Sequence, residues 1–347
     1  MKVVQIGSNK GNDDLSNYIK ETKVNLEFGL FVEANPLHIN DLRNCYEKYA
    51  NAFIENVGIK PAYEQNNNMT IYYYTIDGPN YHVASCNKEH LKKFYYHADG
   101  HLEEIKEFSI PCISLDSLFE KYNITELDWL LVDVEGIDAE ILLSTDWKKY
   151  NIKRIDYERL HLGNKKEQIE KMFSDLGYVK TTGLQYGCDD AWVKPEMPYN
   201  LSIENYAIEN CKKDYLRENK NEDYIITLLN YYYDHNNLNE TLRYGGEFLT
   251  ISAPYFEKNR IDVFIKCSHA LLQLNQVQAS MSYSIHALSE AIKLNDYYIE
   301  KAFSNLFSLG VKIDNPNIII FASGFLNPNA NKIERKQSIQ KLFNSIL

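Results

Sequence analysis

The sequence of 347 residues predicts a doubly wound α/β domain followed by an all-α domain of helical hairpins. In the first half, short apolar runs alternate with helical stretches, a pattern typical of a parallel-rich sheet with helices on both faces. The pattern changes near 195–198, beyond which helical periodicity continues and strand patterns almost disappear. Because the length also allows two domains, we place them at 1–198 and 199–347.

The elements of the first domain follow in order from these runs. A strand at Lys2–Ile6 leads to a helix at Leu15–Lys20, for which Asp13 or Asp14 is a suitable N-cap. Pro36 is expected to open a helix, because proline is favoured in a first helical turn. The segment 81–107 fits the sheet poorly and is predicted to be a mobile insertion over the site. We expect further strands at 28–33, 51–59, 69–76, 128–134 and 152–158, helices at 36–49, 115–122, 138–143 and 165–176, and an antiparallel edge hairpin of 178–184 with 191–194.

The second domain is predicted to consist of paired helices. Their spacing and the positions of their apolar residues loosely resemble a tetratricopeptide pattern, and a plain helical bundle explains them equally well. The expected helices span 223–235, 238–251, 261–274, 277–294, 297–309 and 332–346.

Composition narrows the function classes. The formal net charge is −11, and residues 1–198 carry 22 Lys and Arg against 32 Asp and Glu. This acidity disfavours nonspecific binding of nucleic acid or anionic membrane by the first domain. No apolar run is long enough to span a bilayer, and the six cysteines show neither metal spacing nor the density of a disulfide scaffold. We therefore expect a cytoplasmic protein.

A glycine-containing loop points to a nucleoside-type ligand. Gly7 and Gly11 lie between the first strand and the first helix, and Glu33 ends the second strand. Both features fall at the carboxyl edge of a doubly wound sheet, where ligands bind. A carboxylate at that edge can accept hydrogen bonds from both hydroxyls of a ribose. The dinucleotide fingerprint G-x-G-x-x-G is absent, which disfavours NAD.

Carboxylates gather after the strand at 128–134. Asp133 and Glu135 follow the strand, and Asp138 and Glu140 begin the next helix. Such a group can bind a cation, orient a substrate or accept a proton. We expect functional roles for Asp133 and Glu135, whereas Asp138 is interpreted as a helix cap and Glu140 as a solvated charge near a helix start.

The next strand ends in Glu158, with His161 close behind it. Carboxylates and an imidazole at this edge of the sheet can accept a proton from a reacting group. Glu158, His161 and Asp133 are the candidate bases. Structural roles remain open, as a surface loop histidine for His161 and as an ion-pair partner for Glu158.

These motifs together resemble the FkbM-type methyltransferases over roughly residues 1–195. The resemblance rests on V-Q-I-G-S-N-K-G at 4–11, F-V-E-A-N-P at 31–36, N-V-G-I at 56–59, S-L-D-S-L at 114–118 and V-D-V-E-G at 132–136. It implies a class I, Rossmann-like fold that binds S-adenosyl-L-methionine (SAM) and methylates a hydroxyl, usually of a sugar or natural product. An acceptor such as a surface glycan is an expectation from the resemblance alone.

The resemblance also implies roles for individual residues. Gly7, Ser8, Asn9 and Gly11 would surround the methionine moiety, Glu33 would hold the ribose, and Asn56 and Val57 would lie by the adenine. Many SAM enzymes have an acidic residue where this chain has Gln5, so one contact near the methionine is uncharged here. The implied cofactor-binding set is Gln5, Gly7, Ser8, Asn9, Gly11, Glu33, Ala34, Asn56, Val57 and Asp133, and the catalytic set is Asp133, Glu135, Glu158 and His161.

Three alternatives stay open at this stage. A divalent metal could bind where the carboxylates cluster, but it is not the favoured interpretation, and no metal ligand is assigned. The acceptor could be nitrogen or carbon, although the chain has D-V-E-G at 133–136 where base N-methyltransferases carry N-P-P-Y. Finally, the helical domain could recruit a protein partner in glycan assembly, which would make the chain a scaffold or binding protein.

Overall fold

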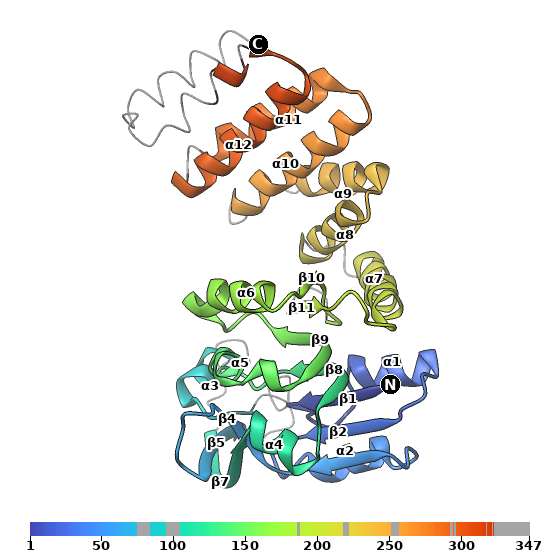
Figure 1. Cartoon of the computed structure of the whole chain (residues 1–347), viewed down its shortest axis with the longest axis vertical. Helices are drawn as coiled ribbons and strands as arrows, with labels where there is room; N and C mark the ends of the chain where they lie inside the picture. Colours follow the sequence, from blue (N-terminus) through green and yellow to red (C-terminus); the bar gives the residue numbers. More distant parts are fainter. Residues whose placement is uncertain are drawn as a thin grey trace. The chain divides into compact units, whose positions relative to one another are not determined.

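A computed structural model describes residues 1–74, 84–94, 105–185, 188–217, 222–250, 257–291, 294, 296–316, 318–320 and 322. Two compact units form, Met1–Glu209 and Asn210–Leu347. The first is an α/β unit and the second is helical, which confirms the predicted fold class (Figure 1). The predicted helix at 332–346 lies outside the described residues.

The first unit is built on a seven-stranded sheet in the order β10-β11-β9-β8-β1-β2-β3. The strands β3, β2, β1, β8 and β9 run parallel, and β11 and β10 form the predicted antiparallel edge. Because β1 pairs with β2 on one side and with β8 on the other, the chain order reverses at β1, where such sheets bind ligands. The strand bounds are β1 Lys2–Ile6, β2 Phe28–Val32, β3 Ala52–Glu55, β8 Glu126–Val132, β9 Asn151–Glu158, β10 Val179–Thr182 and β11 Asp189–Val193.

Helices cover both faces of this sheet because successive strand residues point to opposite sides. On one face Val3, Phe31 and Trp129 pack with α1, α2 and α7, and on the other Val4 and Leu130 pack with α4, α5 and α6. Apolar side chains therefore fill two cores, which explains the continuous apolar runs of the central strands. The helix bounds are α1 Asp14–Thr22, α2 Ile39–Tyr46, α4 Leu115–Lys121, α5 Asp138–Ser144, α6 Lys166–Asp175 and α7 Asn200–Arg217.

The predicted single strand at 51–59 is wrong, because the chain leaves the main sheet within it. Residues 52–55 form β3, and after Asn56 and Val57 the strand β4, Gly58–Lys60, pairs with β7 instead. The helix expected from Pro36 is also shorter and begins at Ile39. The residues between Asn35 and the helix form a turn. The Asn35 side chain accepts a hydrogen bond from the amide of Leu37, and its backbone carbonyl accepts one from the amide of His38.

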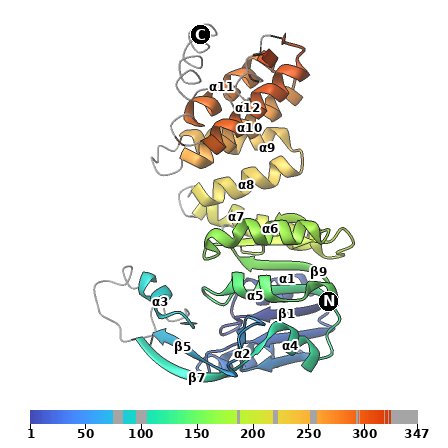
Figure 2. The ribbon, with the colours of Figure 1, turned by 60° about the vertical axis from the view of Figure 1, so that its left-hand side comes forward.

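A second sheet, in the order β4-β7-β5-β6, lies beside the first (Figure 2). It contains β7, which was not predicted, and the described part of the expected insertion, which forms β6 and α3. Of the predicted insertion at 81–107, residues 81–83 and 95–104 lie outside the described residues. The bounds are β5 Asn68–Tyr74, β6 Ala84–Ser85, α3 Lys88–Phe94 and β7 Ile105–Ser114.

A buried ion pair joins the antiparallel edge to the main sheet. Arg154 on β9 is fully buried and forms two bonds to the carboxylate of Asp156, at 2.7 and 2.8 Å. Asp156 also accepts hydrogen bonds from the Trp129 indole and the Leu184 amide, at 2.8 and 2.9 Å. A buried pair of this kind is tolerated because its remaining polar atoms are satisfied.

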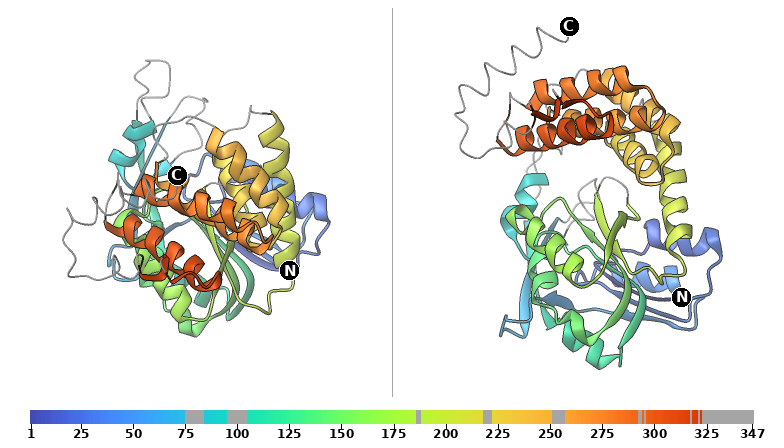
Figure 3. Two further views of the ribbon diagram at one scale, coloured as in Figure 1. Left: turned by 90° about the horizontal axis from the view of Figure 1, so that it is seen from above. Right: turned by 45° about the horizontal axis from the view of Figure 1, so that its top comes forward.

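The helices of the second unit lie side by side in chain order (Figures 1 and 3). Their positions agree with the prediction, whereas α7, which ends in this unit, was not predicted. The tetratricopeptide resemblance stays a prediction. Within the described residues no helix is long and apolar enough to cross a membrane. The bounds are α8 Glu222–Asp234, α9 Leu238–Thr250, α10 Glu257–Gln273, α11 Val277–Ala291 and α12 Asp296–Lys312.

Candidate active site

The loop after β1 brings the ends of three strands together. The backbone amides of Gly7 and Ser8 both donate to the carbonyl of Val32 at the end of β2, at 2.9 and 3.0 Å. Gly7 has a φ of +81°, and a Cβ there would lie 1.6 Å from the carbonyl oxygen of Asp133. Only glycine adopts this positive φ readily and leaves room for the carbonyl. Glycine at this position therefore allows the ends of β1, β2 and β8 to lie close together.

Glu33 follows β2 and is fixed by this loop. Its two carboxylate oxygens accept hydrogen bonds from the backbone amides of Asn9 and Asn35, each at 2.7 Å. The side chain is buried, and burial raises the pKa of Glu33 to about 7 against the partial opposition of these hydrogen bonds. The carboxylate is thus held in one orientation and keeps lone pairs for further donors.

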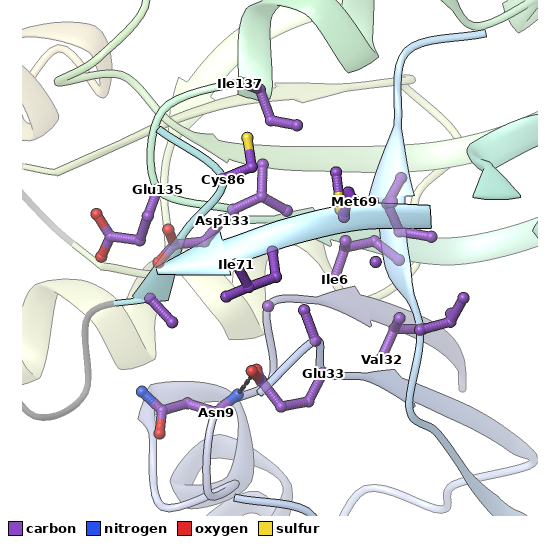
Figure 4. Close-up of a pocket in the computed structure, with 17 residues that line it drawn as sticks. Ile6, Asn9, Val32, Glu33, Met69, Ile71, Cys86, Asp133, Glu135 and Ile137 are labelled. Atoms are coloured by element: carbon purple, nitrogen blue, oxygen red, sulfur yellow. Dashed lines mark hydrogen bonds between the residues drawn. The ribbon is translucent and has the colours of Figure 1, made fainter. Parts of the chain in front are cut away.

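A cavity opens between Glu33 and the end of β8. Glu33 and Asn9 lie on one side of it, and Asp133 and Glu135 lie on the other (Figure 4). The empty space within it, part of which is open to solvent, amounts to about 630 Å³. Both sheets line this first cavity, through Ile6, Gly7, Asn9, Val32, Glu33, Ala34, Val57, Gly58, Ile59, Met69, Ile71, Ala84, Cys86, Asp133, Val134, Glu135 and Ile137.

A second cavity lies beyond Gly7. It shares Ile6, Gly7, Asn9 and Asp133 with the first cavity, so these residues separate two adjoining spaces. Its other walls come from α1 and the residues before it, from the ends of β8 and β9, and from the stretch between β10 and the start of β11. The residues found there but not in the first cavity are Gln5, Asn12, Asp13, Asp14, Leu15, Asn17, Leu131, Val132, Asp156, Tyr157, Leu184, Gln185 and Asp189.

The loop after β8 has an unusual backbone. Glu135 has a φ of +56°, in the left-handed region that costs a non-glycine residue free energy. Asp138 holds this conformation, because its two carboxylate oxygens accept hydrogen bonds from the amides of Val134 and Gly136 at 2.9 and 3.1 Å. The interpretation of Asp138 as a helix cap is therefore wrong, since its carboxylate binds the preceding loop. Glu140 pairs with Lys165, a structural role.

Two histidines meet the carboxylates of this loop. His90 Nε2 lies 3.0 Å from Glu135 Oε2, and His161 Nε2 lies 3.2 Å from Glu158 Oε1. The two imidazole rings are in edge contact, with centroids 4.3 Å apart. Ser85 donates a hydrogen bond of 2.6 Å to the backbone carbonyl of Glu135. The second sheet is thereby fastened to the loop at the point where α3 delivers His90.

The carboxylates of this region repel one another in a poorly solvated place. Desolvation, followed by the charges of Glu135 and Asp138, raises the pKa of Asp133 well above its ordinary value. Desolvation and the same neighbours raise the pKa of Glu158 to about 8. Asp133 Oδ1 and Glu158 Oε2 are buried and have no hydrogen-bond partner within the described part of the chain. Both atoms are therefore available to a ligand.

Some of the predicted site residues lie behind the cavities. Ser8 donates to the Gln5 carbonyl at 3.0 Å, and Gly11 packs against α2, so the described structure places neither in the wall of these two cavities. Asn56 supports the rim, since its amide donates to the backbone carbonyl of Glu33 at 2.8 Å. Gln5 donates to Asp13 at 2.7 Å, and its Oε1 is buried without a partner among the described residues.

His90 was not predicted from the sequence. It lies in the segment expected to be an insertion over the site, and the sequence there has no motif that singles out a histidine. The only signal was the expectation that this insertion lies at the carboxyl edge of the sheet. Its proximity to Glu135 depends on the pairing of β5, β6 and β7, which joins residues distant in sequence.

Comparison with known proteins identifies the domain that carries these cavities. The family model described as the methyltransferase FkbM domain matches residues 5–180, just over half of the chain. The match includes the loop after β1, Glu33, the loop after β8 and the cluster with the two histidines. No curated protein matches the chain in sequence.

Proposed function

The chain belongs to the FkbM methyltransferase family, and we propose that it transfers the methyl group of SAM to a hydroxyl oxygen of a sugar or another small molecule. One observation carries the cofactor assignment. The buried Glu33 carboxylate is fixed by two backbone amides at the rim of the first cavity. A carboxylate in this place is suited to accept hydrogen bonds from the two hydroxyls of a ribose.

The other residues of the first cavity fit the rest of such a ligand. Val57, Met69 and Ile71 offer apolar surfaces to a base, and the Gly7 loop lets the backbone approach the ligand closely. Gln5 Oε1 is a buried acceptor without a partner among the described residues, and it suits an ammonium donor. We therefore expect the methionine end to lie near the boundary between the two cavities.

The second cavity is the proposed acceptor site, because it meets the first cavity at Asp133. SAM supplies a methyl group on a positively charged sulfur; transfer breaks the carbon–sulfur bond, leaves the electron pair on sulfur and forms a carbon–oxygen bond. Asp133 is placed to accept the hydroxyl proton of the acceptor, since its Oδ1 is unpartnered among the described residues and borders both spaces.

Calorimetric titration of the full chain with SAM tests the cofactor assignment. We expect one SAM site per chain. Asp133→Asn should change the Kd for SAM by no more than a few-fold, whereas turnover should fall by about 100-fold, the contribution typical of a general base. Glu21→Gln, an exposed change on α1 outside both cavities, is the matched control for both measurements. Absence of SAM binding to the wild-type chain would refute the proposal.

The acceptor class is tested by transfer of isotopically labelled methyl groups to a panel of glycans and small hydroxylated molecules. Mass spectrometry and nuclear magnetic resonance then identify the atom that receives the label. A methyl group found on oxygen supports the proposal, whereas methylation of nitrogen or carbon alone contradicts it.

A further inference from the structure

We propose that His90, Glu135, His161 and Glu158 form a binding site for one divalent transition-metal ion. The donors of His90, Glu135 and His161 lie within 4.8 Å of one another, and so do those of Asp133, Glu135 and Glu158. Glu135 is common to both groups. The four proposed ligands come from α3, from the loop after β8, and from the end of β9 and the loop that follows it, so the fold brings them together from distant parts of the sequence.

The distances suit coordination. Tetrahedral ligands about 2.1 Å from an ion are separated by about 3.4 Å from one another. The closest donor atoms here are separated by 3.0 Å for His90 and Glu135 and by 3.2 Å for His161 and Glu158. To hold an ion, each of these two pairs would have to open by only a few tenths of an ångström.

Burial supplies an independent argument. The Glu158 side chain is only 10% exposed, yet its Oε2 has no partner among the described residues. The His90 side chain is 3% exposed. An unsatisfied buried carboxylate oxygen costs free energy, and a cation bound between it and the imidazoles would remove that cost. Such an ion would also offset the repulsion among Asp133, Glu135 and Glu158.

The ligand types indicate the class of ion. Imidazole nitrogen together with carboxylate oxygen suits zinc, cobalt, iron or manganese, whereas magnesium and calcium prefer oxygen alone. Asp133 borders the second cavity, and its donor lies within 4.8 Å of those of Glu135 and Glu158. In the proposed methyl transfer, the ion would therefore lie beside the acceptor, would orient two neighbouring oxygens of it and would acidify its hydroxyl. That role depends on the proposed function, but the metal site itself does not.

The test uses the full chain, freed of metal with a chelator, and Co²⁺ as the probe. Equilibrium dialysis with metal analysis, together with visible absorption, should show one Co²⁺ per chain with nitrogen ligation. We expect His90→Asn and Glu158→Gln each to weaken Co²⁺ binding by at least tenfold, since removal even of a supporting contact costs about 10- to 100-fold. His235→Asn, an exposed change on the second unit, is the matched control and should leave binding unchanged.

Failure of the metal site and failure of the proposed function give different results. A wild-type chain that binds SAM but no stoichiometric Co²⁺ overturns the metal site alone, and one that binds Co²⁺ but not SAM overturns the function alone. Equal affinity for Mg²⁺ and Co²⁺ would refute ligation by the histidines. Circular dichroism and SAM affinity establish that each variant is folded, and the wild-type stoichiometry decides the question even if one variant does not fold.

Discussion

Replacement of Glu33 by Gln tests whether a buried, ionisable carboxylate forms the ribose end of the first cavity. Burial raises the pKa of Glu33 from 4.5 to about 7. The folded chain therefore holds this proton up to a higher pH than the unfolded chain does. Between these two pKa values the contribution of Glu33 to the free energy of unfolding falls as pH rises, and above pH 7 it stays constant.

The magnitude follows from the shift. A difference of one pKa unit corresponds to 1.36 kcal/mol. For a pKa of 4.5 in the unfolded chain and about 7 in the folded chain, the contribution of Glu33 to the free energy of unfolding falls by about 2.5 kcal/mol from pH 5 to pH 8. The glutamine side chain of the variant cannot titrate. The free energy of unfolding of Glu33→Gln, relative to wild type, should therefore rise by about 2.5 kcal/mol from pH 5 to pH 8, whatever the constant cost of the substitution.

Urea unfolding monitored by tryptophan fluorescence measures this difference, and it reports on the α/β unit that contains Glu33. The three tryptophans of the sequence, Trp129, Trp147 and Trp192, all lie in Met1–Glu209. The apparent SAM affinity of wild type should also increase by about tenfold from pH 6 to pH 8, in step with the ionised fraction of Glu33, and this increase should be absent in the variant. A stability difference that is the same at pH 5 and pH 8 would refute the reasoning.

Three further predictions concern the surrounding framework. Gly7→Ala should weaken SAM binding by at least tenfold in calorimetry, because its Cβ would overlap a carbonyl oxygen, whereas Gly246→Ala, which meets open space, should leave binding unchanged. Arg154→Met should lower the free energy of unfolding by about 3–5 kcal/mol in urea, and a second change, Asp156→Leu, should restore much of it; no restoration would contradict the uncompensated charge as the cause. Asp138→Ala should lower kcat by about tenfold with little change in SAM affinity, since it frees the loop after β8; an equal loss of both would argue against a local role.

The sequence predicts best those parts of the fold that local patterns determine. Buried parallel strands appear as apolar runs, and the side chains that follow them must gather at one edge of the sheet. Glu33, Asp133 and Glu158 could therefore be placed near one another before their contacts were known. The same rule accounts for the agreement between the predicted and observed central strands.

The parts that could not be predicted depend on distant pairings. Nothing local in the β-rich run at 51–59 shows that its two halves enter different sheets. The sequence of β7 contains Pro111, and its apolar and polar residues alternate only weakly. Its strand conformation therefore depends on pairing with β5. His90 reaches Glu135 only through that second sheet. Arg154 and Asp156 are two residues apart and therefore lie on the same face of β9. Burial of their ion pair, however, depends on β10 and on the residues that follow it.

The first cavity has walls from both sheets, with Val32 and Glu33 on one side and Met69 and Ile71 on the other. A ligand in it would therefore act as a bridging part of the fold. At a concentration 100 times its Kd, such a ligand adds about 2.7 kcal/mol to whatever holds the two sheets together. The second sheet would then resist local opening and proteolysis more strongly as the ligand concentration rises.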